Sequence, residues 1–323
     1  MIKFENVSVT YPGGVEALKD LDLEIKEGDF IIIVGLSGAG KSTLLRTINN
    51  LVKPTNGTVY LEDKDVTNAK KRELKNIRSQ IGMIFQTFNL VNRSTVLKNV
   101  LTGRLSTIST FRSIFGLWPK DQKQLAFEAL EQVEILEKAY VRASNLSGGQ
   151  QQRVGIARSL AVEPDIWFLD EPFSALDPLI RKEMQDEFLR LQEKLQKTIM
   201  FITHDFDEAL KLADRIAIMK DGIIEQLDTP ANIVLKPATE YVRKFTEEVP
   251  REKVLKIEDI MDKPNNENLS DLKVLKDEII ENVAEKILNQ EKSVGVIDKN
   301  DQIVGIVQPS KIINTVFGGK RSD

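Results

Sequence analysis

The segment GLSGAGKST at residues 35–43 restricts the fold of this chain more than any other stretch. It follows an apolar run at 30–34 and opens a segment of helical periodicity, which is the strand, loop and helix setting of a phosphate-binding loop. Its glycines let successive backbone N–H groups turn inward around the β- and γ-phosphates, at the positive end of the helix dipole. Lys41 adds a point charge there, and Ser42 adds a hydroxyl ligand for Mg²⁺. The segment therefore predicts a nucleotide-binding α/β fold.

Short apolar runs rich in β-branched residues alternate with segments of helical periodicity as far as about residue 240. This alternation predicts buried parallel strands joined by crossover helices. The middle of the chain, roughly 87–161, has no such run, and we expect it to form a mostly helical inserted subdomain. The five predicted strands are 30–35, 81–86, 165–170, 198–203 and 215–220.

Composition and charge exclude several classes of protein. The 323 residues suit two unequal domains, and the hydrophobic fraction of 41% allows a sizeable core. A net charge of −4 provides no broad positive field for nucleic-acid binding. The lack of cysteine excludes disulfides and thiolate metal sites, and the single histidine excludes multi-histidine sites. The start does not have the layout of a signal peptide, and no apolar run could cross a bilayer, so work at a membrane would need a partner.

Two further motifs provide groups for phosphate chemistry. Asp170 and Glu171 end the buried run IWFLDE, at the place in open α/β sheets where ligands gather. We expect Asp170 to hold Mg²⁺ directly or through water and Glu171 to polarise the attacking water, whereas an isolated Asp-Glu pair would be a solvated strand end. In LSGGQ at 146–150, Ser147 can cap a helix whose free N–H groups point at an arriving anion, although the motif alone also suits an ordinary capped helix.

The sequence pattern changes after about residue 240. A charged stretch leads to a small unit in which two apolar runs flank DKNDQ at 298–302, and this arrangement predicts a hairpin followed by a helix. We therefore expect a first domain at 1–240, a linker at 241–256 and a second domain at 257–323.

In their order along residues 1–240, the motifs resemble those of the ATP-binding cassette (ABC) family. They are GLSGAGKST, Gln86 after IGMIF, LSGGQ, WFLDEP, SALD at 174–177, and His204 after TIMFIT. The resemblance implies a P-loop NTPase cassette with a helical subdomain, which binds ATP and Mg²⁺ and hydrolyses ATP. It also implies a head-to-tail homodimer, in which the phosphate loop of one copy and the LSGGQ of the other close over each ATP.

The resemblance also implies roles for individual residues. Tyr11 would stack on adenine, and Asp177 would join the two sites of the dimer. Gln86 would link Mg²⁺ and the attacking water to the surface that contacts a membrane partner. His204, which as a lone histidine would otherwise be a surface or core residue, matches the residue that contacts the γ-phosphate. The implied catalytic residues are Glu171, His204 and Gln86, the metal ligands are Ser42, Gln86 and Asp170, and the ATP-binding residues are Tyr11, Gly35, Ser37, Gly38, Gly40, Lys41, Ser42, Thr43, Ser147, Gly148, Gly149 and Gln150.

Single-cassette chains without membrane spans resemble the ATPase subunits of bacterial importers. This resemblance implies a peripheral position at the cytoplasmic face of the inner membrane. The implied partners are a separate permease and, indirectly, a solute-binding protein, with no nucleic acid. A soluble ABC ATPase of translation or DNA repair is the alternative class, but such proteins usually carry two fused cassettes or a long coiled coil, and neither is present in this sequence.

The transported solute stays open between two subfamilies. Up to about residue 155, including FGLWPK, the chain resembles phosphonate importer ATPases, and from about 160 it resembles those for glycine betaine and proline. The family's permease contact lies in the first part, so a phosphonate is favoured over a quaternary amine. The second subfamily carries cystathionine-β-synthase (CBS) type regulatory domains, and we expect the tail at 257–323 to be one small α+β CBS-like unit. The alternative for the tail is a stabilising appendage.

Overall fold

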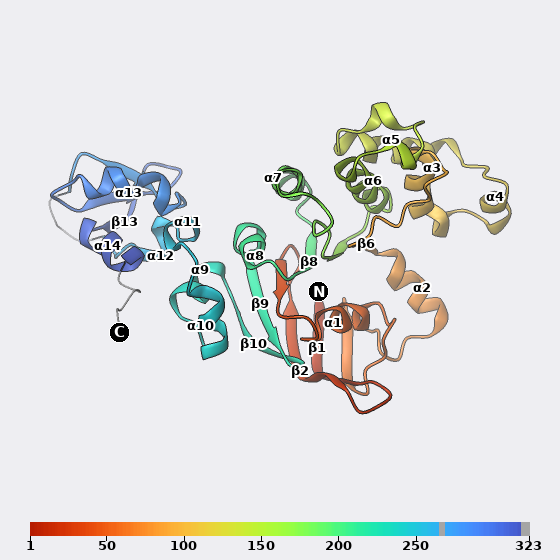
Figure 1. Ribbon diagram of the computed structural model, residues 1–323, viewed down its shortest axis with the longest axis horizontal. Coiled ribbons are helices and arrows are strands. Elements are labelled where there is room, and N and C mark those ends of the chain that lie inside the picture. Colours follow the sequence, from red (N-terminus) through yellow and green to blue (C-terminus); the bar gives the residue numbers. More distant parts are fainter. Residues whose placement is uncertain (265–268, 318–323) are drawn as a thin grey trace. The chain divides into compact units, whose positions relative to one another are not determined.

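The computed structural model describes residues 1–264 and 269–317. The chain divides into two compact units, Met1–Glu225 and Gln226–Asp323, so the division falls earlier than the linker expected at 241–256. Part of the expected second domain, residues 265–268 and 318–323, lies outside the described residues. Figure 1 labels the elements of each unit.

The first unit contains five strands of a six-stranded sheet with the order β10-β9-β3-β8-β7-β6, and the division between the units falls within β10 (Figure 1). The five apolar runs predicted as strands form β3 and β6 to β9, and the prediction that neighbours pair in parallel is confirmed. All five residues of β3 are buried, which explains its continuous apolar sequence. The strands are β3 (Phe30–Val34), β6 (Ile81–Phe85), β7 (Ile166–Asp170), β8 (Thr198–Thr203), β9 (Arg215–Lys220) and β10 (Ile223–Asp228).

The N-terminal part of the chain forms a second, four-stranded sheet with the order β2-β1-β4-β5. Its strand β1 pairs antiparallel with both of its neighbours. Burial alternates along β1, because one face of this sheet packs on the core and the other meets solvent. Its strands are β1 (Ile2–Thr10), β2 (Glu16–Ile25), β4 (Asn56–Leu61) and β5 (Lys64–Asp65).

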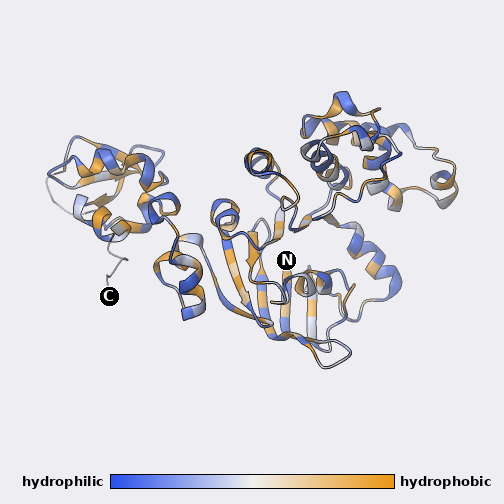
Figure 2. Cartoon of the chain, viewed as in Figure 1, coloured by the Kyte–Doolittle hydropathy of each residue, from blue (hydrophilic) through white to orange (hydrophobic). Residues whose placement is uncertain are grey.

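Four helices accompany these sheets. The ring of Phe188 in α7 packs on Trp167 of β7 and Phe30 of β3, with centroid distances of 5.7 and 6.0 Å, so aromatic contacts fix α7 against the sheet. Figure 2 shows hydrophobic residues along the strands, and hydrophilic ones along much of α2. The helices are α1 (Lys41–Ile48), α2 (Lys71–Ser79), α7 (Pro178–Leu195) and α8 (Phe206–Leu212).

The segment between β6 and β7, whose backbone the structure describes throughout, consists of helices and loops with one isolated β-bridge between Thr95 and Arg142. Its buried Arg104 donates to the Oε1 of Gln122 at 2.7 Å and to the carbonyl oxygen of Ala161 at 2.9 Å, which ties three elements together. These elements are α3 (Val96–Leu101), η1 (Thr102–Thr107), α4 (Thr110–Ile114), α5 (Lys120–Gln132), η2 (Leu136–Lys138), η3 (Ala143–Asn145) and α6 (Gly148–Leu160). We refer to them as the helical subdomain.

The second unit combines helices with a three-stranded sheet of order β11-β12-β13. The hairpin predicted around 298–302 is confirmed, because β12 and β13 pair antiparallel and a helix follows. Branched aliphatic side chains from the strands and helices form its core. The elements are α9 (Pro230–Leu235), α10 (Glu240–Thr246), α11 (Arg251–Val254), α12 (Ile257–Ile260), β11 (Lys273–Leu275), α13 (Ile280–Leu288), β12 (Val294–Ile297), β13 (Ile303–Val307) and α14 (Pro309–Phe317). Within the described ranges of both units, no helix is both long and apolar enough to cross a membrane.

Candidate nucleotide site

The phosphate-binding loop joins β3 to α1, and its glycines are required by the backbone around them. Gly38 and Gly40 have φ values of +87° and +102°, which side chains of L-residues rarely adopt. A Cβ on Gly35 would lie 2.3 Å from the carbonyl oxygen of Met219, and one on Gly40 would lie 2.3 Å from that of Ala17. The loop can therefore keep this shape only with glycine at these positions.

The side chains that follow the loop turn toward it. Lys41 is buried, and its Nζ donates to the carbonyl oxygens of Gly35 at 2.6 Å and Leu36 at 3.1 Å. Burial lowers the pKa of Lys41, while the negative charges of Glu171 and Asp170 oppose that shift. The hydroxyl groups of Tyr11 and Thr43 lie 3.2 Å apart, so the aromatic ring is held beside the first turn of α1.

Strand register brings distant residues to the end of the loop. Asp170, the last residue of β7, pairs with Ile202 in β8, and Val34 at the end of β3 pairs with Thr203. The three strands are parallel, so their carboxyl ends meet at one edge, where ligands bind in open α/β sheets. As a result, Ser42 Oγ lies 3.5 Å from the Oδ1 of Asp170 although the residues are far apart in sequence.

The environment of Asp170 opposes its negative charge. Burial raises the pKa of this carboxyl, and the charge of Glu171 raises it further. Arg46, Ser42 and Lys41 act in the opposite direction, with Arg46 the strongest of the three. A cation placed beside Asp170 would relieve this cost, since a positive charge favours the ionised form.

Glu171 and His204 form a pair at the same edge. His204 directly follows β8, and its Nδ1 lies 3.1 Å from the Oε2 of Glu171. A carboxylate only accepts hydrogen bonds, so Nδ1 carries the hydrogen, and the imidazole presents its Nε2 on the other side. Glu171 itself has a φ of +48°, a left-handed conformation that is uncommon for a residue with a side chain.

The donor set at this edge fits Mg²⁺. The hydroxyl of Ser42 and the carboxylate of Asp170 are hard oxygen ligands on adjacent elements, and Mg²⁺ bound with a nucleotide usually takes one or two protein oxygens plus phosphate and water. Among the described residues, no cluster of three or more His, Cys, Asp or Glu side chains could hold a metal without such help. Gln86 follows β6, whose last residue pairs with Asp170, so it lies at the same edge, and its side chain is exposed.

The LSGGQ segment is structured as a capped helix start. The Oγ of Ser147 accepts from the backbone N–H of Gln150, and the Oε1 of Gln150 accepts from the backbone N–H of Ser147, so both side chains satisfy their own helix α6. A Cβ on Gly149 would lie 2.8 Å from the Cγ2 of Ile180, which explains a glycine there. Asp177 caps α7, and its Oδ1 accepts from the N–H of Ile180 at 3.1 Å.

The structure divides the predicted site residues into two groups. One group gathers at the ends of β3, β6, β7 and β8 and comprises Gly35, Ser37, Gly38, Gly40, Lys41, Ser42, Thr43, Tyr11, Gln86, Asp170, Glu171 and His204. The other group, Ser147, Gly148, Gly149 and Gln150, begins α6 in the helical subdomain, away from α1 in Figure 1. Arg46 was not among the predicted site residues, although its spacing of four from Ser42 on α1 places both side chains on one face of the helix.

Comparisons with known proteins agree with these features. The sequence profile of the family described as "ABC transporter" matches residues 18–174. The trimethylamine N-oxide transport system ATP-binding protein TmoW of Pelagibacter ubique is 61% identical over 310 residues, which are 96% of this chain and 89% of that protein. The phosphonates import ATP-binding protein PhnC of Lactococcus lactis is 48% identical over 242 residues, which are 75% of this chain and 98% of that protein.

A solved structure resembles most of this chain in fold and sequence. It is a dimeric, post-hydrolysis state of the ATP-binding cassette MJ0796 bound to ADP and Pi. The match has a TM-score of 0.61 and 39% sequence identity, and it covers 71% of this chain and 99% of that chain.

Proposed function

Because this chain belongs to the ABC transporter family, as an ATP-hydrolysing transport subunit, we propose that it drives the import of trimethylamine N-oxide through a separate membrane permease. One observation carries the proposal. The relative that serves trimethylamine N-oxide transport is 61% identical over 96% of this chain, a span that must include most of the second unit.

A phosphonate is the second candidate solute. The relative named for phosphonate import is 48% identical, but the match leaves a quarter of this chain without a counterpart while already using 98% of that protein. That relative therefore has no room for a unit like Gln226–Asp323. Glycine betaine, which shares a trimethylated nitrogen with trimethylamine N-oxide, is the third candidate, and it comes from the sequence resemblance alone.

We propose that the gathered residues act on the phosphates of ATP. The Nζ of Lys41 donates to phosphate oxygens in place of the carbonyl oxygens of Gly35 and Leu36. Ser42 and Asp170 together hold Mg²⁺. Mg²⁺, when bound, neutralises charge on the β- and γ-phosphates. Glu171 polarises the attacking water, and His204 contacts the γ-phosphate once the 3.1 Å contact between these two side chains opens.

The remaining predicted residues complete the same proposal. Tyr11 stacks on adenine after it releases Thr43, and Gln86 passes the state of the site to the permease-facing surface. Ser147, Gly148, Gly149 and Gln150 act on the ATP of a second copy, because they lie in the helical subdomain, apart from the phosphate-binding loop of their own chain. The dimeric state of the solved relative supports this arrangement.

Solute-stimulated ATP hydrolysis tests the choice of solute. The chain is reconstituted in vesicles with the permease and binding protein of a trimethylamine N-oxide system, and in parallel with those of a phosphonate system. We expect stimulation by trimethylamine N-oxide in the first vesicles and none in the second. Glu171→Gln is the control for hydrolysis by contaminants. Stimulation by methylphosphonate alone would replace the proposal with the phosphonate candidate. Vesicles with the permease and binding protein of a glycine betaine system test the third candidate, and stimulation only in those vesicles would replace the proposal with it.

We also propose that the second unit is a CBS-like regulatory domain at the cytoplasmic face of the membrane. The succession of β11, α13, β12, β13 and α14 around one aliphatic core supports an α+β unit of this size. Hydrolysis by the reconstituted transporter should then change as ionic strength rises. A rate that stays constant after correction for solute binding would favour a stabilising appendage.

A further inference from the structure

Positive charge is concentrated in one segment of this acidic chain. Between Lys70 and Lys120 there are ten Lys and Arg residues and one acidic residue, Glu73. Ten positive charges minus one negative charge give the segment +9, whereas the whole chain carries −4. No Asp or Glu occurs from Leu74 to Lys120, so no acidic residue lies between the cations of this stretch in sequence.

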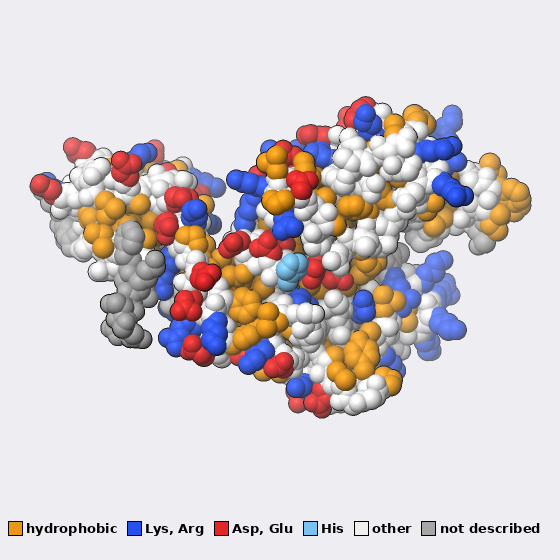
Figure 3. All heavy atoms as spheres, viewed as in Figure 1, with side chains coloured by type: hydrophobic (Ala, Val, Ile, Leu, Met, Phe, Trp, Pro, Cys, Tyr) orange, Lys and Arg blue, Asp and Glu red, His pale blue; other side chains and the backbone are white. Residues whose placement is uncertain are grey.

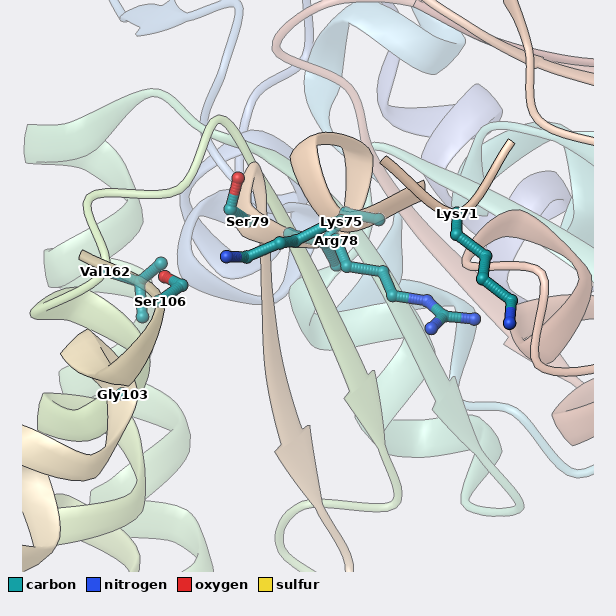
Figure 4. A pocket seen from close by; sticks show the side chains of 8 residues that line it. Lys71, Lys75, Arg78, Ser79, Gly103, Ser106 and Val162 are labelled. Carbon is teal, nitrogen blue, oxygen red and sulfur yellow. The ribbon is translucent and has the colours of Figure 1, made fainter. Parts of the chain in front are cut away.

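The cations of α2 are exposed beside an open cavity. Lys71, Lys75 and Arg78 line a cavity of about 340 Å³ together with Ser79, and η1 contributes Ser106 from the other side. In Figure 4 the amine of Lys75 extends toward Ser106, while Lys71 and Arg78 extend the opposite way. No Asp or Glu is among the residues that line the cavity.

An apolar tip follows the same cavity along the chain. Ser106 is five residues before Phe111, the first of four exposed apolar residues on and after α4. Phe111 is 66% exposed, Ile114 74%, Phe115 63% and Leu117 56%. The rings of Phe111 and Phe115 contact each other in a tilted arrangement, with their centroids 4.7 Å apart. In Figure 3 this tip forms a hydrophobic end of the first unit, with Lys and Arg side chains on both sides of it.

We propose that the apolar tip and the cations of α2 together bind an anionic lipid bilayer. The four tip residues enter the boundary between headgroups and acyl chains, and Lys71, Arg72 and Lys75 of α2 meet the lipid phosphates, while Arg78 donates to the carbonyl oxygens of Asn49 and Asn50. Membrane binding of this kind needs two signals, an apolar insertion and a polybasic patch, and the segment from Lys70 to Lys120 provides both. We call this surface the lipid face.

Charge complementarity favours lipid over protein as the occupant. The negative surface potential of an anionic bilayer attracts a segment that carries cations without carboxylates between them, and no Asp or Glu occurs from Leu74 to Lys120. The tip also consists of Phe, Ile and Leu with few groups that could set the orientation of a protein partner by hydrogen bonds. The lipid face would hold the ATPase at the membrane independently of which solute the transporter carries.

The chain contains its own fluorescent probe for this contact. It has two tryptophans, and Trp167 is fully buried in the sheet, so only the half-buried Trp118 can respond to a bilayer. The full chain is mixed, without any permease, with vesicles of phosphatidylglycerol or of phosphatidylcholine. We expect a blue shift of the emission and quenching by brominated lipid with phosphatidylglycerol only, reversed by high salt.

Two double variants separate the contribution of the apolar tip from that of the cations of α2. Phe111→Ser with Phe115→Ser should weaken binding to the anionic vesicles about tenfold for each ring removed. Lys71→Gln with Lys75→Gln should weaken it about fivefold for each lysine. The matched controls are Leu288→Ser with Ile313→Ser, which are exposed apolar residues of the second unit, and Lys182→Gln with Lys194→Gln, which are exposed lysines of α7. The controls should bind like wild type, and every variant should hydrolyse ATP in solution at the wild-type rate.

Other outcomes would contradict the proposal that the lipid face binds an anionic bilayer. Equal binding to both kinds of vesicle, or a Trp118 emission that does not change, would remove the role of anionic lipid. Binding that survives the loss of Phe111 and Phe115 would place the contact elsewhere. If wild type binds only vesicles that contain a permease, and the tip variant does not, then the tip docks on protein and the lipid proposal is wrong.

Discussion

Glu171 has a backbone conformation that the sequence gives no reason to expect. Its φ of +48° follows directly on the last residue of β7, and it turns the side chain toward His204. Non-glycine residues in this region cost on the order of 1 kcal/mol or more, and they are found disproportionately where a side chain must be aimed. The backbone strain therefore agrees with the water-polarising role proposed for this carboxylate.

Glu171→Gln should preserve ATP binding and remove turnover. The amide keeps the size of the side chain and its contact with His204, but it cannot draw a proton from water, so hydrolysis should fall about a hundredfold or more. ATP-dependent dimers should become long-lived, as seen by size-exclusion chromatography. Glu193→Gln, at an exposed position of α7, is the control. A Glu171→Gln rate close to that of wild type would refute the assigned role.

His204→Ala should affect the reaction far more than the affinity for nucleotide. Loss of one donor to the γ-phosphate costs about a hundredfold in rate, while the contacts of Lys41 with the phosphates remain. The His204 side chain is 60% exposed, so free imidazole should reach the cavity left by alanine and restore part of the rate. A parallel loss of ATP and ADP binding, without imidazole rescue, would point to a folding role instead.

Asp170→Asn should stabilise the nucleotide-free protein while it removes Mg²⁺-dependent hydrolysis. Burial raises the pKa of Asp170 in the folded state, so the folded state binds a proton more tightly than the unfolded chain does. The charged carboxylate therefore lowers stability above the folded pKa, and this penalty fades as pH falls toward the ordinary aspartate value. Asparagine should raise the thermal midpoint at neutral pH, and less so at acidic pH. A lower midpoint at neutral pH would contradict the pKa argument.

At the level of single residues, the sequence predicted which side chains belong to the candidate site better than it predicted which atoms they contact. Gly35 and Gly40 could be assigned because the motif has a fixed backbone requirement. The bonds of Lys41 to the carbonyl oxygens of Gly35 and Leu36, and the influence of Arg46 on Asp170, depend on how α1 and β7 lie in space. No one-dimensional spacing contains that information.

For the secondary-structure elements, the sequence predicted which segments form strands, but it did not predict the order of those strands in the sheet. The five apolar runs became strands because long branched runs have few alternatives to burial in a sheet. The order β9-β3-β8-β7-β6 places β3 between two strands that follow it far along the chain, and nothing in β3 itself identifies those neighbours. The contact of Glu171 with His204 follows from this order, and neither the spacing of the motifs nor the family resemblance predicted it.

Arg104→Ala should destabilise the helical subdomain by about 2–4 kcal/mol, since a buried cation and its hydrogen bonds are removed together. The change leaves the Oε1 of Gln122 and the carbonyl oxygen of Ala161 without this donor, so that only Thr107 of η1 still donates to Gln122 of α5. Urea denaturation followed by circular dichroism measures the loss. Arg93→Ala, at an exposed arginine of the same subdomain, should cost less than about 0.5 kcal/mol. Equal costs for the two variants would show that Arg104 does not tie the elements together.

For the whole molecule, the separation of the phosphate-binding loop from the start of α6 predicts that activity requires two copies. Lys41→Ala chains and Ser147→Arg chains should each be inactive alone. A mixed dimer keeps one site with Lys41 from one copy and Ser147 from the other, so the mixture should recover at most about a quarter of wild-type hydrolysis. Hydrolysis is measured against the mixing ratio, with unmixed variants as controls. Activity that does not depend on protein concentration in wild type would rule out the dimer.

The sequence pattern placed the end of the first domain at residue 240, whereas the packing of the chain divides it after Glu225. Composition changes near residue 240, but α9 and α10 belong with Gln226–Asp323. Charged and polar residues on the outer faces of short helices resemble a linker in composition, while their buried faces, such as Ile233 and Val234, pack as a domain. Composition averages over both faces and cannot separate them.

The strand order also has a consequence for synthesis of the chain on the ribosome. β3 pairs only with β8 and β9, and the backbone N–H of Gly28 donates to a residue 170 positions later, Thr198. At about 5–20 residues per second, the FIIIV segment waits roughly 8–35 s for its neighbours. During that interval an unpaired, fully apolar strand is exposed, so the nascent chain is a strong candidate for chaperone binding until translation has passed residue 220.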